Sequence, residues 1–273
     1  MSVSASDAEA VDFLIALIYE RSRIRLHEGK HPLIRARLGK RLRHHGFETL
    51  SEYCRYLRQS GDEAEMTQVI DSLTTNYTMF LREREHFDFM IEEALPTILM
   101  PHQKQFQIWS SACATGEEPY SLAIYLAENY PLEAGWDWRI LATDISTRAL
   151  SQAMQAVYPA ERLQSVPQEW LRRYFQRGQN RWSGYYRVKD FLQARIEFKH
   201  LNLLGDYEFG TRFPLIFCRN VMIYFDRATQ QQLGRKLCPM LAGQGFLLVG
   251  HSESLNGLDL PLRCRRPSIY QKN

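Results

Sequence analysis

The sequence predicts an α/β fold: a doubly wound parallel sheet, preceded by an all-helical N-terminal domain and interrupted by a small antiparallel β insertion. Residues 1–75 carry only helical periodicities, whereas from about residue 100 short apolar runs alternate with helical stretches. An aromatic-rich stretch between Tyr158 and Asp190 breaks that alternation. The predicted boundaries are 1–75 for the helical domain, 76–100 for a linker and 101–273 for the sheet domain, with the insertion at 158–192.

Four amphipathic helices are expected in the helical domain, because apolar residues recur there at three-to-four spacing. Asp7 is the predicted N-cap of the first helix, whose apolar residues extend to Ile24, and Thr49 is the predicted N-cap of the third. The expected helices lie at about 10–24, 32–46, 50–60 and 66–73.

Strands and helices alternate in the sheet domain. Helices are predicted near Glu117, from Ser146 or Thr147, and after Asp226, which is a suitable N-cap. In the insertion, GQNRWSG (178–184) is typical of a turn between two short strands. The predicted strands of the main sheet are Phe106–Ala112, Arg139–Asp144, Arg195–Asn202, Pro214–Asn220, Gly245–Gly250 and the C-terminal RPSIYQK.

Composition excludes several classes of protein. Hydrophobic residues make up 45% and charged residues 24%, which excludes a disordered chain, a collagen-like repeat and a small disulfide scaffold. The net charge of +3 is too small for a general nucleic-acid footprint. Five cysteines without a C-x-x-C pair indicate reduced thiols, and we expect no metal. No signal peptide or membrane-spanning run is evident, so we expect a soluble, cytoplasmic protein without direct membrane insertion.

One segment of the helical domain is strongly basic. Between Arg21 and His45 there are nine Lys or Arg residues and one acid, Glu28. Two interpretations are open: a solvated helix surface, which is the usual outcome for a charge run, or a docking face for an acidic partner, either nucleic acid or an acidic helix.

The loop after the first predicted strand argues against a phosphate site. ACATGEEPYS contains a single glycine, Gly116, and lacks the G-x-G-x-x-G fingerprint that wraps a pyrophosphate. Glu117 and Glu118 occupy the helix start, where an anion would otherwise bind. They suit an ammonium or sulfonium, or they simply complement the helix dipole.

Asp144 ends the second predicted strand, a position suited to accepting hydrogen bonds from ribose hydroxyls. It is equally suited to capping the next helix. Taken with the two glutamates, it indicates a nucleoside ligand that carries a positive group and no pyrophosphate. S-adenosylmethionine fits that description.

Five strings then make the resemblance specific. They occur in the family's order and span nearly the whole chain. Through them the sequence resembles the family of chemoreceptor glutamate O-methyltransferases of bacterial chemotaxis, which implies a Rossmann-like methyltransferase sheet. The implied reaction moves a methyl group from S-adenosylmethionine to glutamate side chains on cytoplasmic receptor helices, leaving S-adenosylhomocysteine. The strings are SLTTNYTMFLRE (72–83), ACATGEEPYSLA (112–123), ATDIS (142–146), FCRNVMIYFD (217–226) and GHSESL (250–255).

The resemblance implies cofactor contacts at residues of matching type. Arg82 is expected to grip the methionine carboxylate as a bidentate pair, Glu118 to face the ammonium and Asp144 to hold the ribose. Asn202 and Leu203 are expected at the adenine, and Asn220 and Val221 beside the reacting methyl. The full implied set is Asn76, Thr78, Arg82, Glu118, Asp144, Asn202, Leu203, Asn220 and Val221.

Arg82 and Tyr224 are the expected catalytic residues. Tyr224 is placed to shape the pocket around the sulfonium, although packing with Phe217 and Phe225 is an equally good explanation of it. Arg82 as a surface ion pair is the weaker alternative. A glutamate acceptor has a pKa of about 4.3 and is already ionised at neutral pH, so no general base is required. Positioning alone can contribute roughly 7–11 kcal/mol.

The expected partner is the cytoplasmic domain of a chemoreceptor. Its acidic helix would dock on Arg35, Arg37, Lys40, Arg41 and Arg43. The insertion resembles the family's β-subdomain, which in some members binds a C-terminal receptor peptide by strand addition. The GQNRWSG turn differs in composition from the glycine-rich loop of those members.

Three other functions fit the sequence less well than this one. A nicotinamide-dependent oxidoreductase would require the missing glycine fingerprint. Methylation of nucleobase amines is disfavoured, because Asn220 to Tyr224 lacks the Pro-Pro-aromatic string typical of those enzymes, and we expect no nucleic-acid partner. A non-catalytic scaffold or sensor that binds S-adenosylmethionine is the remaining alternative.

Overall fold

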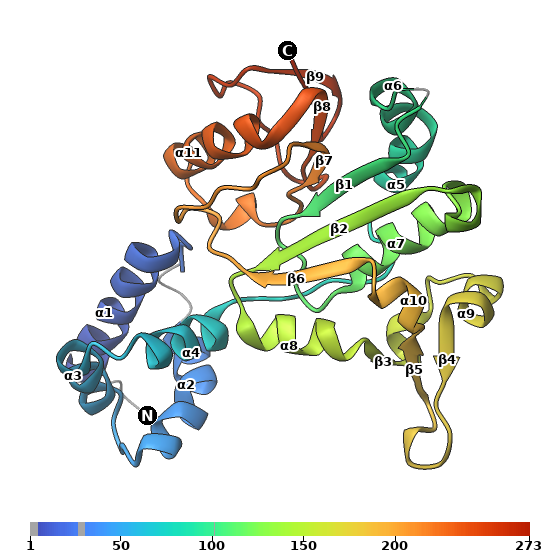
Figure 1. Ribbon diagram of the computed structural model, residues 1–273. Coiled ribbons are helices and arrows are strands. Elements are labelled where there is room, and N and C mark those ends of the chain that lie inside the picture. The colour runs from blue at the N-terminus through green and yellow to red at the C-terminus, as the bar shows by residue number, and fades with distance from the viewer. Residues whose placement is uncertain (1–4, 27–30, 101) are drawn as a thin grey trace. The chain divides into compact units, whose positions relative to one another are not determined.

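The computed structural model describes residues 5–26, 31–100 and 102–273 (Figure 1). The chain divides into two compact units. One contains the residues up to Thr75 together with Tyr224–Thr229, and the other contains Asn76–Ile223 and Gln230–Asn273. Within the described ranges, no helix combines the length and the apolar character needed to cross a membrane.

Over its described residues the first unit is helical, as predicted. Thr49 is confirmed as an N-cap: its side chain accepts from the Glu52 N–H, and Glu52 bonds back to the Thr49 N–H. The start of the first helix was predicted wrongly, because Asp7 lies inside α1, and α1 ends before Ile24, where Arg23 takes φ 58°. The helices are α1 (Ala5–Ser22), α2 (His31–His45), α3 (Leu50–Ser60) and α4 (Glu63–Leu73).

The second unit is built on a seven-stranded sheet of order β6-β2-β1-β7-β8-β10-β9. The first five strands are mutually parallel, and β10 pairs antiparallel with both β8 and β9. The edge strand β9 was not predicted, because its sequence LRCRR is largely charged and exposed. The strands are β1 (Gln105–Ser110), β2 (Asp137–Asp144), β6 (Ile196–His200), β7 (Phe213–Phe217), β8 (Leu241–Leu248), β9 (Leu262–Arg266) and β10 (Ile269–Lys272).

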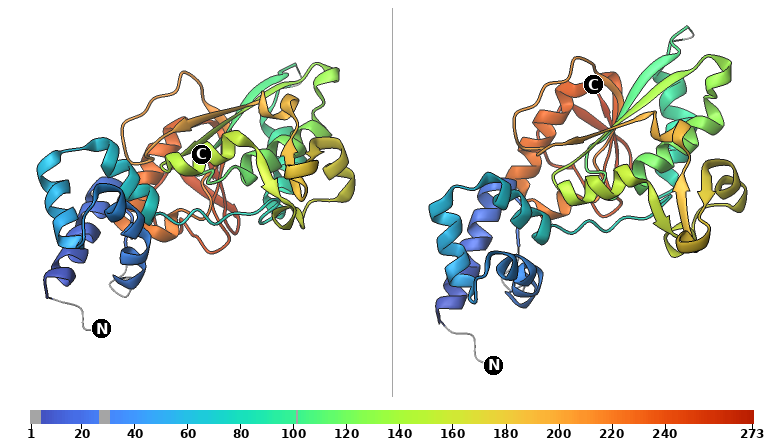
Figure 2. Two further views of the ribbon diagram at one scale, coloured as in Figure 1. Left: turned by 90° about the horizontal axis from the view of Figure 1, so that it is seen from below. Right: turned by 60° about the horizontal axis from the view of Figure 1, so that its bottom comes forward.

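Helices cover both faces of this sheet (Figures 1 and 2). The chain moves outward in one direction through β1, β2 and β6 and in the other through β7 and β8. Because parallel crossovers are right-handed, the two directions place their helices on opposite faces. Helices α7 (Glu117–Asn129) and α8 (Thr147–Gln155) lie on one face, and α11 (Arg227–Leu237) lies on the other. The predicted doubly wound sheet is confirmed.

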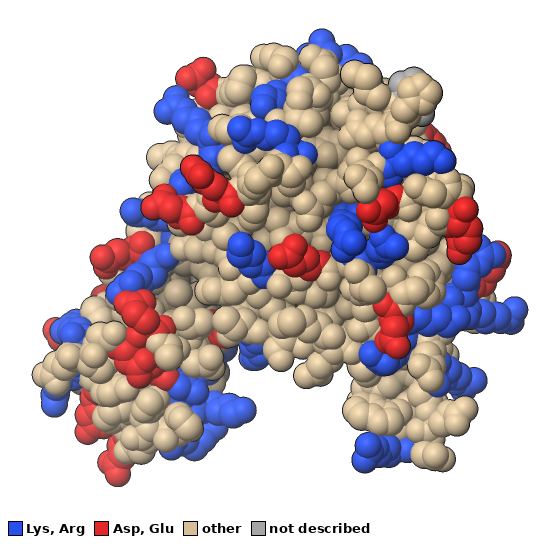
Figure 3. Space-filling view, in the orientation of Figure 1, with Lys and Arg blue, Asp and Glu red and all other residues tan. Residues whose placement is uncertain are grey.

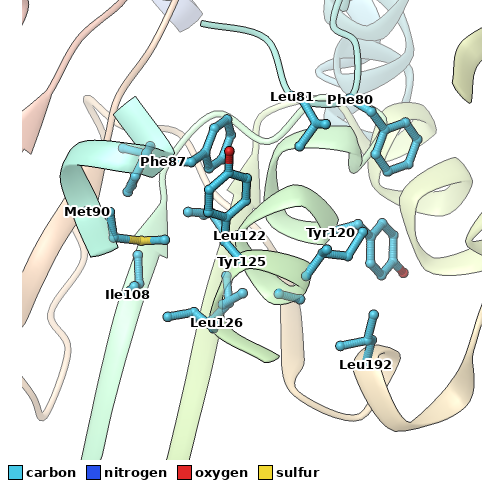
Figure 4. Packing of buried hydrophobic residues seen from close by; sticks show 14 of the residues in the cluster. Phe80, Leu81, Phe87, Met90, Ile108, Tyr120, Leu122, Tyr125, Leu126 and Leu192 are labelled. Carbon is cyan, nitrogen blue, oxygen red and sulfur yellow. The ribbon is translucent and has the colours of Figure 1, made fainter. Parts of the chain in front are cut away.

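The segment 76–100 holds more structure than the predicted linker. After an extended stretch it forms α5 (Glu85–Phe89), a π-helical turn (Met90–Ala94) and α6 (Leu95–Ile98). The Phe87 ring stacks on Tyr125 of α7 at 5.2 Å between centroids and lies 5.9 Å from Phe217 of β7. Figure 4 shows Phe87 and Tyr125 side by side in this core. These contacts anchor the segment to the core of the sheet.

The aromatic insertion forms the antiparallel sheet that the sequence predicts, with order β3-β5-β4. Tyr158 and Phe175 are buried, and both rings pack edge-on against Phe80. The insertion thus shares the core of the second unit. Its elements are β3 (Val157–Pro159), α9 (Gln168–Tyr174), β4 (Phe175–Arg177), β5 (Tyr185–Val188) and α10 (Asp190–Gln193).

Candidate functional site

The strand order reverses between β1 and β7, and ligands of doubly wound sheets bind beyond the carboxyl ends of the strands at such a switch point. The loops that follow β1, β2, β6 and β7 carry most of the predicted cofactor contacts. The remaining ones lie in the segment 76–84 before α5, whose last residues, from 80 to 84, form turns.

The carboxylate of Asp144 organises two of these loops. It accepts a hydrogen bond from the Ala114 N–H at 2.8 Å and another from the Ser146 N–H at 2.8 Å. The N-cap of α8 is Ser146 itself, whose side chain accepts from the Ala149 N–H. Asp144 therefore ties the loop after β1 to the start of the loop after β2.

The loop after β1 is tightly turned. Ala114 and Gly116 have φ values of 47° and 95°. A Cβ on Gly116 would lie 2.7 Å from the Tyr158 hydroxyl, so only glycine fits there. The Tyr158 hydroxyl donates to the Thr115 carbonyl at 2.8 Å, which fixes the turn from the insertion side.

The two glutamates at the start of α7 have different partners. Glu117 is fully buried, accepts from the Thr115 hydroxyl at 2.6 Å and pairs with Arg162 at 3.0 Å. Glu118 accepts from the Ser110 hydroxyl at 2.7 Å and pairs with Arg219 at 3.0 Å. Burial raises the pKa of both carboxyls, although Thr115 and Arg162 oppose it at Glu117 and Arg219 opposes it at Glu118.

Arg219 is the hub of a buried charge network that sequence reasoning missed. Besides Glu118, it pairs with Glu83 at 3.0 Å and donates to the Arg82 carbonyl. Burial raises the pKa of the Glu83 carboxyl, but Arg219 and the Asn220 amide outweigh burial and hold that pKa below its usual value. The network joins the end of β7, the start of α7 and the segment before α5. The sequence signal that could have pointed to Arg219 is its position inside the motif FCRNVMIYFD.

The extended segment before α5 is held at several points. The Asn76 amide donates to the Ser146 hydroxyl at 3.1 Å, and Thr78 is buried with its carbonyl 3.3 Å from the Arg162 guanidinium. Arg82 donates to the Tyr77 carbonyl at 3.2 Å and lies 3.9 Å from Glu83. Its side chain is 30% exposed, so the guanidinium stays accessible to an anionic group.

The loop after β7 is fixed by a carboxylate that sequence reasoning also missed. Buried Glu253 accepts from the backbone N–H groups of Gly250, of Asn220 at 2.8 Å and of Ile223 at 3.1 Å. Asn220 takes φ 57°, and its amide donates to Glu83 at 3.1 Å. The motif GHSESL contains Glu253, but its partners could not be deduced from the sequence.

The predicted adenine contacts follow β6. The Leu201 N–H donates to the Asp144 carbonyl at 2.9 Å, which sets Asn202 and Leu203 just beyond the end of β2. The Asn202 side-chain oxygen accepts from the Leu204 N–H at 3.0 Å, and Leu203 is buried.

Tyr224 belongs to the first unit, where its carbonyl accepts from the Arg25 N–H at 2.9 Å. Its predicted role in shaping the pocket around the sulfonium stays a prediction. The neighbouring Asp226 is confirmed as a helix cap, because its carboxylate accepts from the Thr229 N–H at 2.8 Å.

The five basic residues predicted to dock a partner differ in their surroundings. Arg37 donates to the carbonyls of Leu73 and Thr74, and Arg41 pairs with buried Glu65. Arg35 is half-buried, whereas Lys40 and Arg43 are exposed. In Figure 3, Lys and Arg side chains gather on part of the helical unit.

Three side chains beside the Arg219 network have the spacing of a metal site. Ligand atoms of Glu83, His86 and His251 lie within 4.8 Å of one another. The Glu83 carboxylate is already engaged by the Arg219 guanidinium and the Asn220 amide, which compete with a cation for its lone pairs.

The donor set at the switch point fits a nucleoside with a cationic group. Asp144 and Glu118 carry carboxylates, which accept hydrogen bonds from hydroxyl and ammonium groups, and Asn202 carries an amide, which can both donate and accept. Acids at the start of α7 disfavour a phosphate there. S-adenosylmethionine matches this donor set.

The comparisons with known proteins agree with this chemistry. Residues 76–269 match the family described as CheR methyltransferase, SAM binding domain, and residues 9–74 match CheR methyltransferase, all-alpha domain. A chemotaxis protein methyltransferase of Borreliella burgdorferi is 37% identical over 266 residues, covering 95% of this chain and 93% of its own. Those of Salmonella typhimurium and Escherichia coli are each 38% identical over 255 residues, covering 93% of this chain and 86% and 87% of their own.

Likeness to solved structures is weaker. The N-methyltransferase NodS from Bradyrhizobium japonicum, in complex with S-adenosyl-L-homocysteine, has a TM-score of 0.34 and 19% identity, covering 61% of this chain and 60% of that chain. A likeness this low supports no conclusion. The two family matches together span most of the chain, and the curated relatives share more than a third of its residues. The chain belongs to the CheR methyltransferase family: it is a methyltransferase of chemotaxis, and its cofactor is S-adenosylmethionine.

Proposed function

We propose that the acceptor is a glutamate side-chain carboxylate of a chemoreceptor and that the product is a glutamyl methyl ester. One observation carries this proposal: the Glu83 carboxylate beside Asn220 is engaged by the Arg219 guanidinium and the Asn220 amide, so it does not serve as a proton acceptor. Glu83 is held ionised by Arg219, and burial lowers the pKa of neighbouring His86 to about 3. A carboxylate acceptor is already ionised at neutral pH and needs no base, unlike an amine or hydroxyl.

In this mechanism the chain's residues bind and orient. The cofactor supplies the electrophilic methyl group on its sulfonium. Arg82 holds the methionine carboxylate, Glu118 the ammonium and Asp144 the ribose. Asn76 and Thr78 contact the cofactor from the same segment as Arg82. Asn202 and Leu203 hold the adenine. Asn220 and Val221 border the methyl group.

The role of the network around Glu253 and Arg219 is to keep these groups in place. Glu253 fixes the backbone of Asn220 and Ile223, and Arg219 joins Glu83 to Glu118. Catalysis then consists of aligning the acceptor oxygen, the methyl carbon and sulfur while water is excluded. Such positioning contributes roughly 7–11 kcal/mol.

The partner we propose is an acidic helix in the cytoplasmic domain of the receptor, which places the reaction in the cytoplasm. Lys40 and Arg43 are the exposed members of the basic set and suit acidic side chains. The receptor's C-terminal peptide has a candidate site in the insertion, where a cavity of about 590 Å³ lies along β4 and β5 and is lined by Trp182, Tyr185 and Arg187 among others.

The proposal is tested by incubating the chain with methyl-labelled S-adenosylmethionine and receptor cytoplasmic fragments. We expect label on the fragments that mild base releases as methanol, because carboxyl esters hydrolyse and N-methyl groups do not. Fragments in which the labelled glutamates are changed to alanine serve as the control and should take up no label. Base-stable label would identify a different acceptor and overturn the glutamate assignment.

A further inference from the structure

One arginine of the insertion touches two segments of the cofactor site. Arg162 lies in the helical turn Ala160–Leu163 that follows β3. Its guanidinium donates to the Thr78 carbonyl at 3.3 Å and to the Thr115 hydroxyl at 3.4 Å, and it pairs with Glu117 at 3.0 Å. A planar guanidinium directs its N–H groups to several acceptors at once, which an ammonium does with less geometric definition.

The acceptors that Arg162 joins belong to different parts of the fold. Thr78 lies in the extended segment between Asn76 and Arg82, both proposed cofactor contacts. Thr115 lies in the loop after β1, and Glu117 begins the helix α7 that follows this loop. Asp144 fixes the loop from its other side through the Ala114 N–H. In the described part of the chain, the segment around Thr78 pairs with no strand of the sheet, so side chains must set its position.

Neighbouring residues of the insertion hold the same two segments. The Ser165 hydroxyl donates to the Phe80 carbonyl at 2.7 Å, and the Tyr158 hydroxyl donates to the Thr115 carbonyl at 2.8 Å. The Phe80 ring is fully buried against Tyr158 and Phe175. The insertion thus braces the cofactor site from one side, and Arg162 is the charged member of that brace.

We propose that Arg162 is a positioning residue for S-adenosylmethionine: through Thr78 and the Thr115–Glu117 turn, it holds the segment before α5 and the loop after β1 in the arrangement that binds the cofactor. The inference rests on the proposed contact of Thr78 with the cofactor. It assigns the insertion a part in cofactor binding, in addition to any part in receptor recognition.

The first test compares Arg162→Met with the unchanged protein. Calorimetric titration with S-adenosylhomocysteine measures Kd, and thermal unfolding without ligand measures stability. We expect Arg162→Met to raise Kd about tenfold and to lower Tm, since it also leaves the buried Glu117 carboxylate without its cation. Arg162→Lys keeps a positive charge near Glu117 and should raise Kd by a smaller factor.

A double variant separates positioning from stability. Arg162→Met with Glu117→Gln removes both partners of the buried ion pair, and the amide oxygen of the new glutamine still accepts from the Thr115 hydroxyl. We expect Tm to recover toward that of Glu117→Gln alone while Kd stays raised about tenfold, because nothing then holds the Thr78 carbonyl. If Kd returned with Tm to the value of the Glu117→Gln variant, Arg162 would have only a structural role and the inference would be wrong.

A matched control lies in the same insertion. Arg173 on α9 pairs with Glu128 and Glu169 and is half exposed. Arg173→Met removes the same charge and should leave Kd for S-adenosylhomocysteine unchanged. Equal effects of Arg162→Met and Arg173→Met on Kd would also overturn the inference. Failure of the unchanged protein to bind S-adenosylhomocysteine would instead refute the cofactor site itself.

Discussion

Single side chains at the switch point bind backbone groups of several loops. Asp144 accepts N–H groups from the loops after β1 and β2, and Glu253 accepts them from the loops after β7 and β8. Burial raises the pKa of the Glu253 carboxyl, against the backbone N–H groups that favour its ionised form. Residues of this kind preorganise a site, because loops that are already fixed lose little conformational entropy when a ligand binds.

Arg82 provides the first residue-scale prediction. Arg82→Lys should lower kcat/KM for methyl transfer by about 10- to 100-fold, the equivalent of one charge-assisted hydrogen bond, since an ammonium does not reproduce a bidentate guanidinium–carboxylate pair. Steady-state kinetics with receptor fragments measure the change. Arg84→Lys is the control, because Arg84 is exposed and donates to the Tyr125 hydroxyl. Similar losses in both variants would contradict the proposed role of Arg82.

His86 provides a prediction about pH. Burial, followed by the charge of Arg219, lowers the pKa of His86 to about 3, from about 6.5 in an unfolded chain. Between these values the unfolded state binds more protons than the folded state, so the contribution of His86 to stability is present above pH 6.5 and is lost as pH falls toward 3.

The pH prediction is checked by urea unfolding of the protein and of His86→Gln at pH 7 and pH 5. The free energy of unfolding of the unchanged protein should fall by about 2 kcal/mol more over this interval than that of His86→Gln. The glutamine amide of this variant can still donate to the Ser268 hydroxyl, which lies 2.8 Å from the His86 ring. An equal fall in the two proteins would contradict this prediction.

At the scale of elements, the basic residues of α2 have two kinds of surroundings. Arg41 lies against Glu65 and Arg37 against the C-terminal carbonyls of α4, so these two residues stabilise the helical unit. In Glu65, burial raises the pKa, but hydrogen bonds from Arg41, Tyr53 and His45 outweigh it, so that the carboxyl titrates below its usual value. Lys40 and Arg43 are exposed to solvent. Only these two are therefore suitable for testing docking by charge reversal.

Charge reversal on α2 is the element-scale prediction. Lys40→Glu and Arg43→Glu should each raise KM for receptor fragments on the order of threefold at low salt and leave KM for S-adenosylmethionine unchanged. The effect should weaken at high salt. Arg55→Glu on α3 carries the same charge change on an exposed position and serves as the control. Equal changes in both KM values, or none, would reject docking on α2.

At the scale of the whole molecule, the sheet order decides where the site lies. The reversal between β1 and β7 brings loops from distant parts of the chain to one edge. Glu83 and Arg219, which form an ion pair there, are 136 residues apart in the sequence. A ligand that contacts several of these loops should stabilise the folded state of the whole second unit.

Ligand-linked stability is the whole-molecule prediction. At a concentration one hundred times its Kd, S-adenosylhomocysteine should raise the free energy of unfolding by about 2.7 kcal/mol, because it binds only the folded state. Chemical denaturation with and without ligand measures this. NADH at the same concentration is the control and should have no effect, since the glycine fingerprint for its pyrophosphate is absent from the sequence. Stabilisation by NADH alone would contradict the site described above.

Much of this protein follows from local sequence patterns. Apolar periodicity predicted the helical unit, and the alternation of apolar runs with helices predicted the parallel strands. The aromatic-rich stretch with its GQNRWSG turn predicted the antiparallel insertion, and Thr49 and Asp226 predicted two helix starts. Motif order predicted the family. Patterns of this kind are local, because helix periodicity, strand alternation and capping depend on residues within a few positions of each other. The charged edge strand β9 and the first helix start escaped the same rules, because tertiary pairing and backbone context outweigh propensity there.

The tertiary structure alone decided which partners the charged residues take. Nothing in the sequence distinguishes Arg41, which pairs with buried Glu65, from exposed Lys40 beside it. Likewise, Arg162 and Glu253 show no local pattern, yet they join loops that are far apart in the chain. The physical reason is that ion pairs and buried carboxylates satisfy polar groups wherever the fold brings them together. Their partners are set by the topology of the sheet and not by spacing along the chain.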